Sequence, residues 1–202
     1  GGNLKMDLVF LLVLPSLLFV QAWYLLGFYA NPKTLGMIAA GAAIILLAVV
    51  LFQDKLQLVV GIGAPGDLLI TPATAISAFV LVWAGYSVLI AGVYLWGLDT
   101  RSLGFYCLFI AVISGVFSAY FLVGDALLEG VIIQFTWLLG VVAIMLAILA
   151  GLQFFYLSLR PLAQGEPLSS TMRTVTGWFY LVFSVAIGIL GNLLLLGIDP
   201  LL

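Results

Sequence analysis

The sequence predicts an all-α, polytopic membrane protein in which six transmembrane helices form a bundle. Of its 202 residues, 65% are hydrophobic and only 7% are charged, whereas soluble domains carry about 25% charged residues. The apolar residues also gather in six runs with the roughly 20-residue length that crosses a bilayer. A chain with this composition and a net charge of −2 is not expected to be disordered or to bind nucleic acid. Its expected surroundings are a lipid bilayer.

The six apolar runs are separated by short connections and are expected to be helices, because backbone groups inside lipid must be hydrogen-bonded within the protein. They cover residues 7–30, 34–53, 68–96, 102–123, 131–158 and 171–198. We expect residues 1–202 to form one transmembrane domain with no soluble module. Residues 1–5 precede Met6 and could be a remnant of expression.

The first three runs end at recognisable breaks. Asn31-Pro32-Lys33 ends the first, since proline and the residue before it disfavour a helix. The second run leads into the longest connection, 54–67, where 61–66 read G-x-G-x-x-G. No strand precedes that motif, so we interpret it as a loop and not as a dinucleotide site. The third run ends at a predicted tight turn over 97–101. The first run is long enough to be interpreted as an uncleaved span.

The last three runs are bounded in the same way. Residues 124–130, which include two glycines and two carboxylates, follow the fourth run. The connection over 160–170 contains Pro161 and Pro167 and separates the fifth run from the sixth.

The chain lacks several residue types on which enzymes and metal sites depend. It has no histidine and a single cysteine, Cys107, so histidine bases, thiol–imidazole pairs and cysteine clusters are excluded. We interpret Cys107 as a packed, inert thiol. We therefore expect no bound metal, no cofactor and no enzymatic activity.

No Asp, Glu, Lys or Arg lies well inside any run. Intramembrane charges mark proton relays, ion sites and voltage sensors, so their absence argues against pumps, ion-coupled carriers and voltage-gated channels. The polar residues within the runs are neutral, and they could either bond helices together or form a weakly polar lining. They are Ser16, Gln21, Ser77, Ser87, Ser114, Ser118, Gln134, Thr136, Gln153, Ser184 and Asn192.

The positive charges favour an orientation with both termini outside the cell. The positive-inside rule places the side with more Lys and Arg in the cytoplasm. With the N-terminus outside, the inner side carries Lys33, Arg101, Arg160 and Arg173, and the outer side carries Lys5 and Lys55. We expect a multi-pass protein of the cytoplasmic (inner) membrane.

The stretch from Gly97 to Ala111, GLDTRSLGFYCLFIA, is the most specific in the chain. It resembles the third connection and fourth span of the urea/amide channel family (AmiS/UreI), which read similarly to G-L-D-x-R-x-x-x-W-Y-x-L-F-V-A. Asn31-Pro32-Lys33 and Leu128-Glu129-Gly130 also resemble segments of that family. The resemblance implies six spans, a pore within each protomer, a homo-hexamer, and passive passage of urea or short amides.

The chain departs from this family at positions that would line the pore. Of several tryptophans in the fifth span, only Trp137 remains, and the aromatic pair of the third span appears as Trp83 and Ser87. A glutamate of the sixth span has no counterpart, and gating by histidine is excluded because no histidine is present. The expected lining residues are Leu12, Phe19, Trp83, Ser87 and Trp137.

Three functions therefore remain open from the sequence. The first is a passive channel for small neutral solutes. The second is a non-transporting subunit that keeps the channel fold within a larger membrane complex. The third, a membrane enzyme, would depend on loop carboxylates, because no pair of titratable residues lies within the spans.

Overall fold

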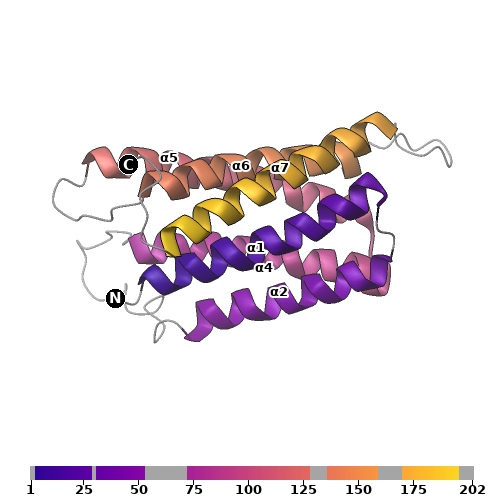
Figure 1. The fold of residues 1–202 in the computed structure, drawn as a ribbon, viewed down its shortest axis with the longest axis horizontal. Coiled ribbons are helices and arrows are strands. Elements are labelled where there is room, and N and C mark those ends of the chain that lie inside the picture. The colour runs from indigo at the N-terminus through magenta and orange to yellow at the C-terminus, as the bar shows by residue number, and fades with distance from the viewer. Residues whose placement is uncertain (1–2, 29–30, 53–71, 128–135, 159–169, 196–202) are drawn as a thin grey trace.

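In the computed structural model, residues 3–28, 31–52, 72–127, 136–158 and 170–195 are described, and they form α-helices without any strand (Figure 1). The helices are α1 (Asn3–Leu26), α2 (Pro32–Phe52), α4 (Pro72–Trp96), α5 (Thr100–Leu127), α6 (Thr136–Ser158) and α7 (Ser170–Leu195). All six are long and apolar enough to cross a membrane. The predicted all-α, six-helix membrane fold is therefore confirmed.

Several predicted boundaries shift for local reasons. α1 begins at Asn3 and ends at Leu26, because Gly27 takes a φ of 81° that glycine adopts readily. α2 begins at Pro32, whose fixed φ suits the first helical position, and the Asn31 side chain accepts a hydrogen bond from the Lys33 N–H at 3.0 Å. α5 continues to Leu127, through part of the expected fourth connection.

Some predicted features lie outside the described residues. They are the connection 54–67 with Lys55 and the glycine motif at 61–66, and residues 160–169 of the fifth connection with Arg160. They also include the segment Leu128-Glu129-Gly130, Gln134, and the outer ends of the runs at 29–30, 53, 68–71, 131–135 and 196–198.

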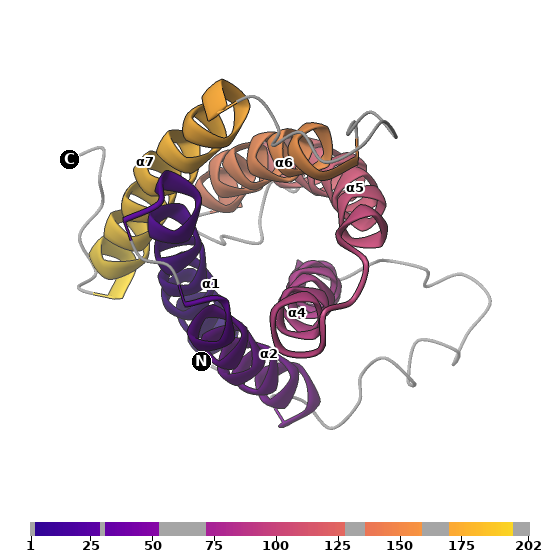
Figure 2. The same ribbon diagram turned by 90° about the vertical axis from the view of Figure 1, so that its right-hand side faces the viewer.

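The six helices form a closed ring when viewed along their axes (Figure 2). Each helix packs against its neighbours in the order α1, α2, α4, α5, α6, α7, and α7 closes the ring against α1. In this order α4 and α7 lie on opposite sides of the ring. Side chains that join α4 to α7 must therefore cross its centre.

Close backbone contact joins α7 to α1. A Cβ atom on Gly191 would lie 2.9 Å from the Leu11 carbonyl oxygen, and one on Gly177 would lie 2.9 Å from the Leu26 side chain. Pro15 lies inside α1 and has no N–H to bond the Leu11 carbonyl. Glycine on α7 thus lets the two backbones approach where that carbonyl is left free, as small residues do between membrane helices.

The stretch that most resembles the channel family begins with the turn between α4 and α5. Gly97 has a φ of 70°, and the Leu98 N–H donates to the Gly92 carbonyl oxygen at 3.4 Å, which ends α4. Asp99 then caps α5, because its carboxylate accepts bonds from the Arg101 N–H at 3.1 Å and the Ser102 hydroxyl at 3.2 Å. The backbone bond from Arg101 is the main reason that the pKa of Asp99 lies below its usual value.

Three of the four cations assigned to the inner side lie at one end of the bundle. Lys33 is at the start of α2, Arg101 at the start of α5 and Arg173 at the start of α7. Arg173 donates to the carbonyl oxygens of Leu25 at 2.7 Å and Tyr24 at 3.0 Å. Its guanidinium thus binds two carbonyl oxygens at the C-terminal end of α1. The Tyr24 oxygen also accepts a hydrogen bond from the Gly27 N–H at 3.1 Å. This end of the bundle is called the basic end below.

Candidate functional site

The centre of the ring contains a hydrogen-bonded cluster from three helices, which we call the central cluster: Gln21 on α1, Tyr86 on α4 and Tyr180 on α7. The Tyr86 hydroxyl donates to Gln21 Oε1 at 2.9 Å and lies 3.1 Å from the Tyr180 hydroxyl. Since the Tyr86 proton goes to Gln21, Tyr180 is the donor in the second bond. All three side chains have an exposed fraction of 0%. The pair of tyrosines therefore joins opposite sides of the ring and fills its centre.

A second buried group lies beside the central cluster. The Trp83 indole N–H donates to the Ser114 hydroxyl at 3.3 Å, and the Trp83 and Tyr86 rings meet edge to face at 5.2 Å. The Ser87 hydroxyl donates to the Trp83 carbonyl oxygen at 3.1 Å. Trp83, Ser87 and Ser114 are all fully buried. The helical spacing of 83, 86 and 87 puts these side chains on one inward face of α4.

Phenylalanines fill the part of the ring farther from the basic end. Phe79 contacts Phe10, Phe117 and Phe121 with ring centroids 5.6, 5.2 and 6.2 Å apart. At the basic end, Tyr24 meets Tyr94 at 5.1 Å. Starting from the basic end, the interior of the ring thus contains first a tyrosine pair, then the neutral polar centre, and then an apolar phenylalanine cluster.

Three buried polar atoms in the described residues have no hydrogen-bond partner. They are Gln21 Nε2, Gln153 Oε1 and Thr176 Oγ1. Their residues have exposed fractions of 0%, 1% and 0%. A buried polar group without a partner is costly and is uncommon in folded proteins. These three atoms therefore have hydrogen-bonding capacity that the described residues do not use.

The buried polar residues of the described structure are all uncharged. They are Gln21, Ser87, Ser114, Ser118, Gln153, Ser158, Thr176 and Ser184. Within the described residues no group of three His, Cys, Asp or Glu side chains is arranged to hold a metal. The arrangement can form hydrogen bonds to a neutral molecule.

The five predicted lining residues fall into two groups. Trp83 and Ser87 lie next to each other and beside the central cluster. Phe19 is 37% exposed and meets Trp23 edge to face at 5.9 Å. Leu12 and Trp137 are half-buried. Within the described residues, no hydrogen bond or ring contact joins either of them to the central cluster. A lining role for each residue stays a prediction.

The polar residues that the sequence identified also divide. Gln21, Ser87, Ser114, Ser118, Gln153 and Ser184 are buried. Ser16 and Asn192 instead point outward, and each donates to a carbonyl oxygen of its own helix, at 2.7 and 2.8 Å. Outward polar side chains on a membrane helix commonly satisfy themselves in this way.

Sequence reasoning missed Tyr86, Tyr180 and Thr176. Tyr180 belongs to an aromatic run at 178–180 near the end of its span, where tyrosine and tryptophan are ordinarily explained by the membrane interface. A signal was present, because residues 177, 180, 184, 187 and 191 recur at helical spacing and all are buried. That stripe defines the inward face of α7.

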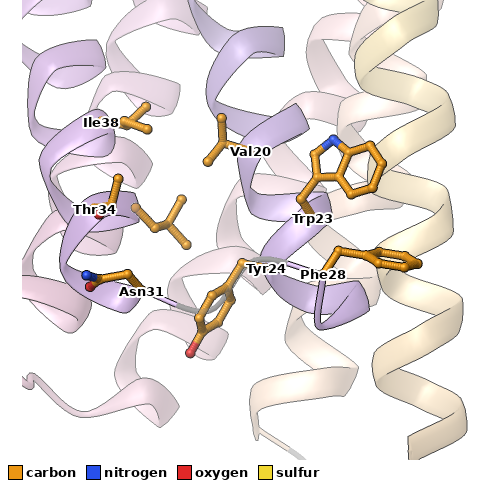
Figure 3. Close-up of a pocket in the computed structure, with 8 residues that line it drawn as sticks. Val20, Trp23, Tyr24, Phe28, Asn31, Thr34 and Ile38 are labelled. Atoms are coloured by element: carbon orange, nitrogen blue, oxygen red, sulfur yellow. The ribbon is translucent and has the colours of Figure 1, made fainter.

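A groove of about 560 Å³ lies between α1 and α2 at the basic end (Figure 3). Its walls are mainly apolar, with Asn31 and Thr34 as polar exceptions. They are formed by Val20, Trp23, Tyr24, Phe28, Asn31, Thr34, Leu35 and Ile38. The groove shares no residue with the central cluster.

Comparisons with known proteins identify the fold. No protein-family model and no curated protein matches the chain. A solved structure that is similar is the crystal structure of the urea channel from the human gastric pathogen Helicobacter pylori, with a TM-score of 0.68 and 17% sequence identity. The match covers 95% of this chain and 98% of that one. The chain therefore has a urea-channel-like fold along nearly its whole length.

Proposed function

We propose that this protein is a passive channel for small neutral solutes such as urea or short-chain amides, and that it is not gated by histidine. The observation that carries the proposal is the contact between Tyr86 and Tyr180, in which uncharged hydrogen-bonding groups from opposite helices meet at the centre of the ring. The likeness to a urea channel supports it. A planar neutral amide can pass between aromatic rings and a few hydrogen-bonding groups, so it needs no charged filter.

The central cluster would act as the narrowest point of the pathway. For a solute to pass, the Tyr86 and Tyr180 hydroxyls must separate and exchange their mutual bond for bonds to the solute. Such an exchange conserves the number of hydrogen bonds, so its net free energy is small. Trp83 and Ser87 would continue the lining, and the phenylalanine cluster around Phe79 would form a second, apolar narrowing.

The surroundings of the channel follow from charge and resemblance. We propose that the basic end faces the cytoplasm, which puts both termini outside an inner membrane. A homo-oligomer, hexameric by resemblance to the channel family, is the proposed assembly. If the protein is instead a non-transporting scaffold, other membrane subunits would be its partners.

A non-transporting scaffold is the second candidate, and one observation favours it. Trp83, Tyr86 and Tyr180 are fully buried, so the centre of the ring is packed as a core would be. Such a subunit would keep the fold and contribute its outer face to a larger complex.

Two measurements separate these functions. Purified protein in liposomes is exposed to urea or acetamide gradients, and vesicle volume is followed by stopped-flow light scattering. A channel raises solute flux above that of empty vesicles, whereas a scaffold leaves it unchanged. Purification in a mild detergent supplies the complementary result, because a scaffold brings stoichiometric foreign subunits and a channel forms a homo-oligomer.

A further inference from the structure

We propose that Gln21 Nε2, Thr176 Oγ1 and Gln153 Oε1 form a binding site for a primary amide or urea, on the basic side of the Tyr86–Tyr180 contact. This inference rests on the proposed channel function and names the groups that select its solute. Its starting point is that all three atoms are buried and have no partner.

The three residues that carry these atoms occupy similar positions along their helices, measured from the basic end. Gln21 and Gln153 each lie five residues before the end of their helix, and Thr176 lies six residues after the start of α7. These three helix termini are all at the basic end, because successive helices run in opposite directions. A rise of 1.5 Å per residue puts each residue roughly 8–9 Å from that end.

The three helices that carry these atoms are consecutive in the ring, since α7 packs against both α1 and α6. Thr176 is four residues before Tyr180, so both lie on the same inward face of α7. Gln21 is tied to the same place, because its Oε1 accepts the Tyr86 proton. Its Nε2 is therefore held close to the tyrosine pair while remaining available.

The chemistry of the three atoms matches an unsubstituted amide. Gln21 Nε2 can only donate, Gln153 Oε1 can only accept, and Thr176 Oγ1 can do either. A primary amide or urea offers the complementary set, a carbonyl oxygen for Gln21 and N–H groups for Gln153 and Thr176. A solute without N–H groups would leave the Gln153 oxygen unpaired, which is the strongest way for a polar site to reject an analogue.

The test compares two shape-conserving variants with matched controls. Thr176→Val removes the hydroxyl, and Thr176→Ser keeps it. Gln153→Met removes the whole side-chain amide, both Oε1 and Nε2. Asn192→Leu removes an amide from the outward side of α7, where Asn192 bonds only its own helix. Circular dichroism and size-exclusion chromatography verify that each variant folds and assembles.

Two readouts are taken, solute flux in liposomes and saturation-transfer NMR from micellar protein to the methyl groups of acetamide or N,N-dimethylacetamide. We expect Thr176→Val and Gln153→Met each to lower urea and acetamide flux about threefold to tenfold, because each removes one hydrogen bond to the solute. Saturation transfer to acetamide should fall together with the flux. For Thr176→Ser and Asn192→Leu, both flux and transfer should stay within about twofold of the wild-type values. Acetamide should show stronger transfer than N,N-dimethylacetamide in wild type, and Gln153→Met should remove that preference.

The readouts distinguish failure of the site from failure of the channel. Wild-type flux that both deletions leave unchanged would overturn the site and leave the channel standing. Acetamide transfer that the deletions abolish, without any wild-type flux, would support the site and overturn the channel. The absence of both flux and transfer in wild type would overturn both proposals.

Discussion

Replacing Tyr86 by phenylalanine should destabilise the protein more than the same replacement of Tyr180, although the two hydroxyls bond each other. Tyr86 has two partners, Gln21 Oε1 at 2.9 Å and the Tyr180 hydroxyl at 3.1 Å. Its loss leaves both partners buried and unpaired. The loss of the Tyr180 hydroxyl instead leaves Tyr86 still donating to Gln21.

The magnitude follows from this count of unpaired groups. Each buried polar group left without a partner costs about 1–3 kcal/mol, whereas an ordinary hydrogen bond contributes about 0.5–1.5 kcal/mol. Hydrogen bonds between membrane helices average only about 0.6 kcal/mol, so the lower parts of these ranges apply. We expect Tyr86→Phe to lower the free energy of unfolding by about 2–3 kcal/mol and Tyr180→Phe to lower it by about 0.5–1 kcal/mol.

The assay is reversible unfolding in mixed micelles, followed by circular dichroism for wild type, both single variants and the double variant. The double variant should be little worse than Tyr86→Phe alone, because the shared bond is lost once. Equal destabilisation by the two single variants, or a larger effect of Tyr180→Phe, would refute the assignment of two hydrogen-bond partners to Tyr86 and one to Tyr180.

Three further predictions concern packing, capping and gating. Gly191→Ala should lower the free energy of unfolding by about 1–3 kcal/mol in the same assay, because the added methyl group overpacks against the Leu11 carbonyl. The control Gly151→Ala, whose added Cβ meets nothing within 4 Å, should be neutral or stabilising. The reverse order of stability would contradict the α1–α7 contact. Asp99 has a lowered pKa in the folded protein, so the stability it supplies should be present above the ordinary carboxyl pKa of about 3.9 and be lost as pH falls through the lowered value. Thermal melts of wild type and Asp99→Asn should therefore converge on acidification, and a gap that widens would oppose the cap. Urea flux should not vary between about pH 5 and 8, since no histidine is present to titrate there; a steep step in the flux–pH profile would exclude ungated passage.

The fold was predictable because bilayer physics leaves few choices. Long apolar runs without charge must be helices, and the breaks at Pro32 and Gly97 are set by backbone chemistry that the sequence displays. The exact ends of the helices were less predictable, since α5 continues through Gly124 and Asp125 to Leu127. Whether a glycine ends a membrane helix depends on its φ, which composition does not encode.

The candidate site was predictable only in part. Trp83, Ser87 and Gln21 were identified because polar and aromatic residues deep in a span are conspicuous. Tyr180 was not, because a tyrosine near a span end is equally suited to the membrane interface. Its inward direction depends on how α7 is turned, which the contacts of Gly177 and Gly191 with α1 determine.

The resemblance to the channel family is informative in a similar, limited way. The stretch from Gly97 to Ala111 is its most specific part, and its first residues form a turn and a helix cap around Asp99. These residues determine how α4 and α5 are joined. They do not indicate which solute passes through the ring, which depends on the central cluster.

The most direct test of the account is urea flux through the purified protein in liposomes, measured by stopped-flow light scattering beside empty vesicles. We expect urea and acetamide flux clearly above the empty-vesicle rate, and lower flux when Thr176 is replaced by valine. Flux equal to that of empty vesicles, from protein that is folded and correctly inserted, would contradict the claim that the centre of this helix ring is a pathway for neutral solutes.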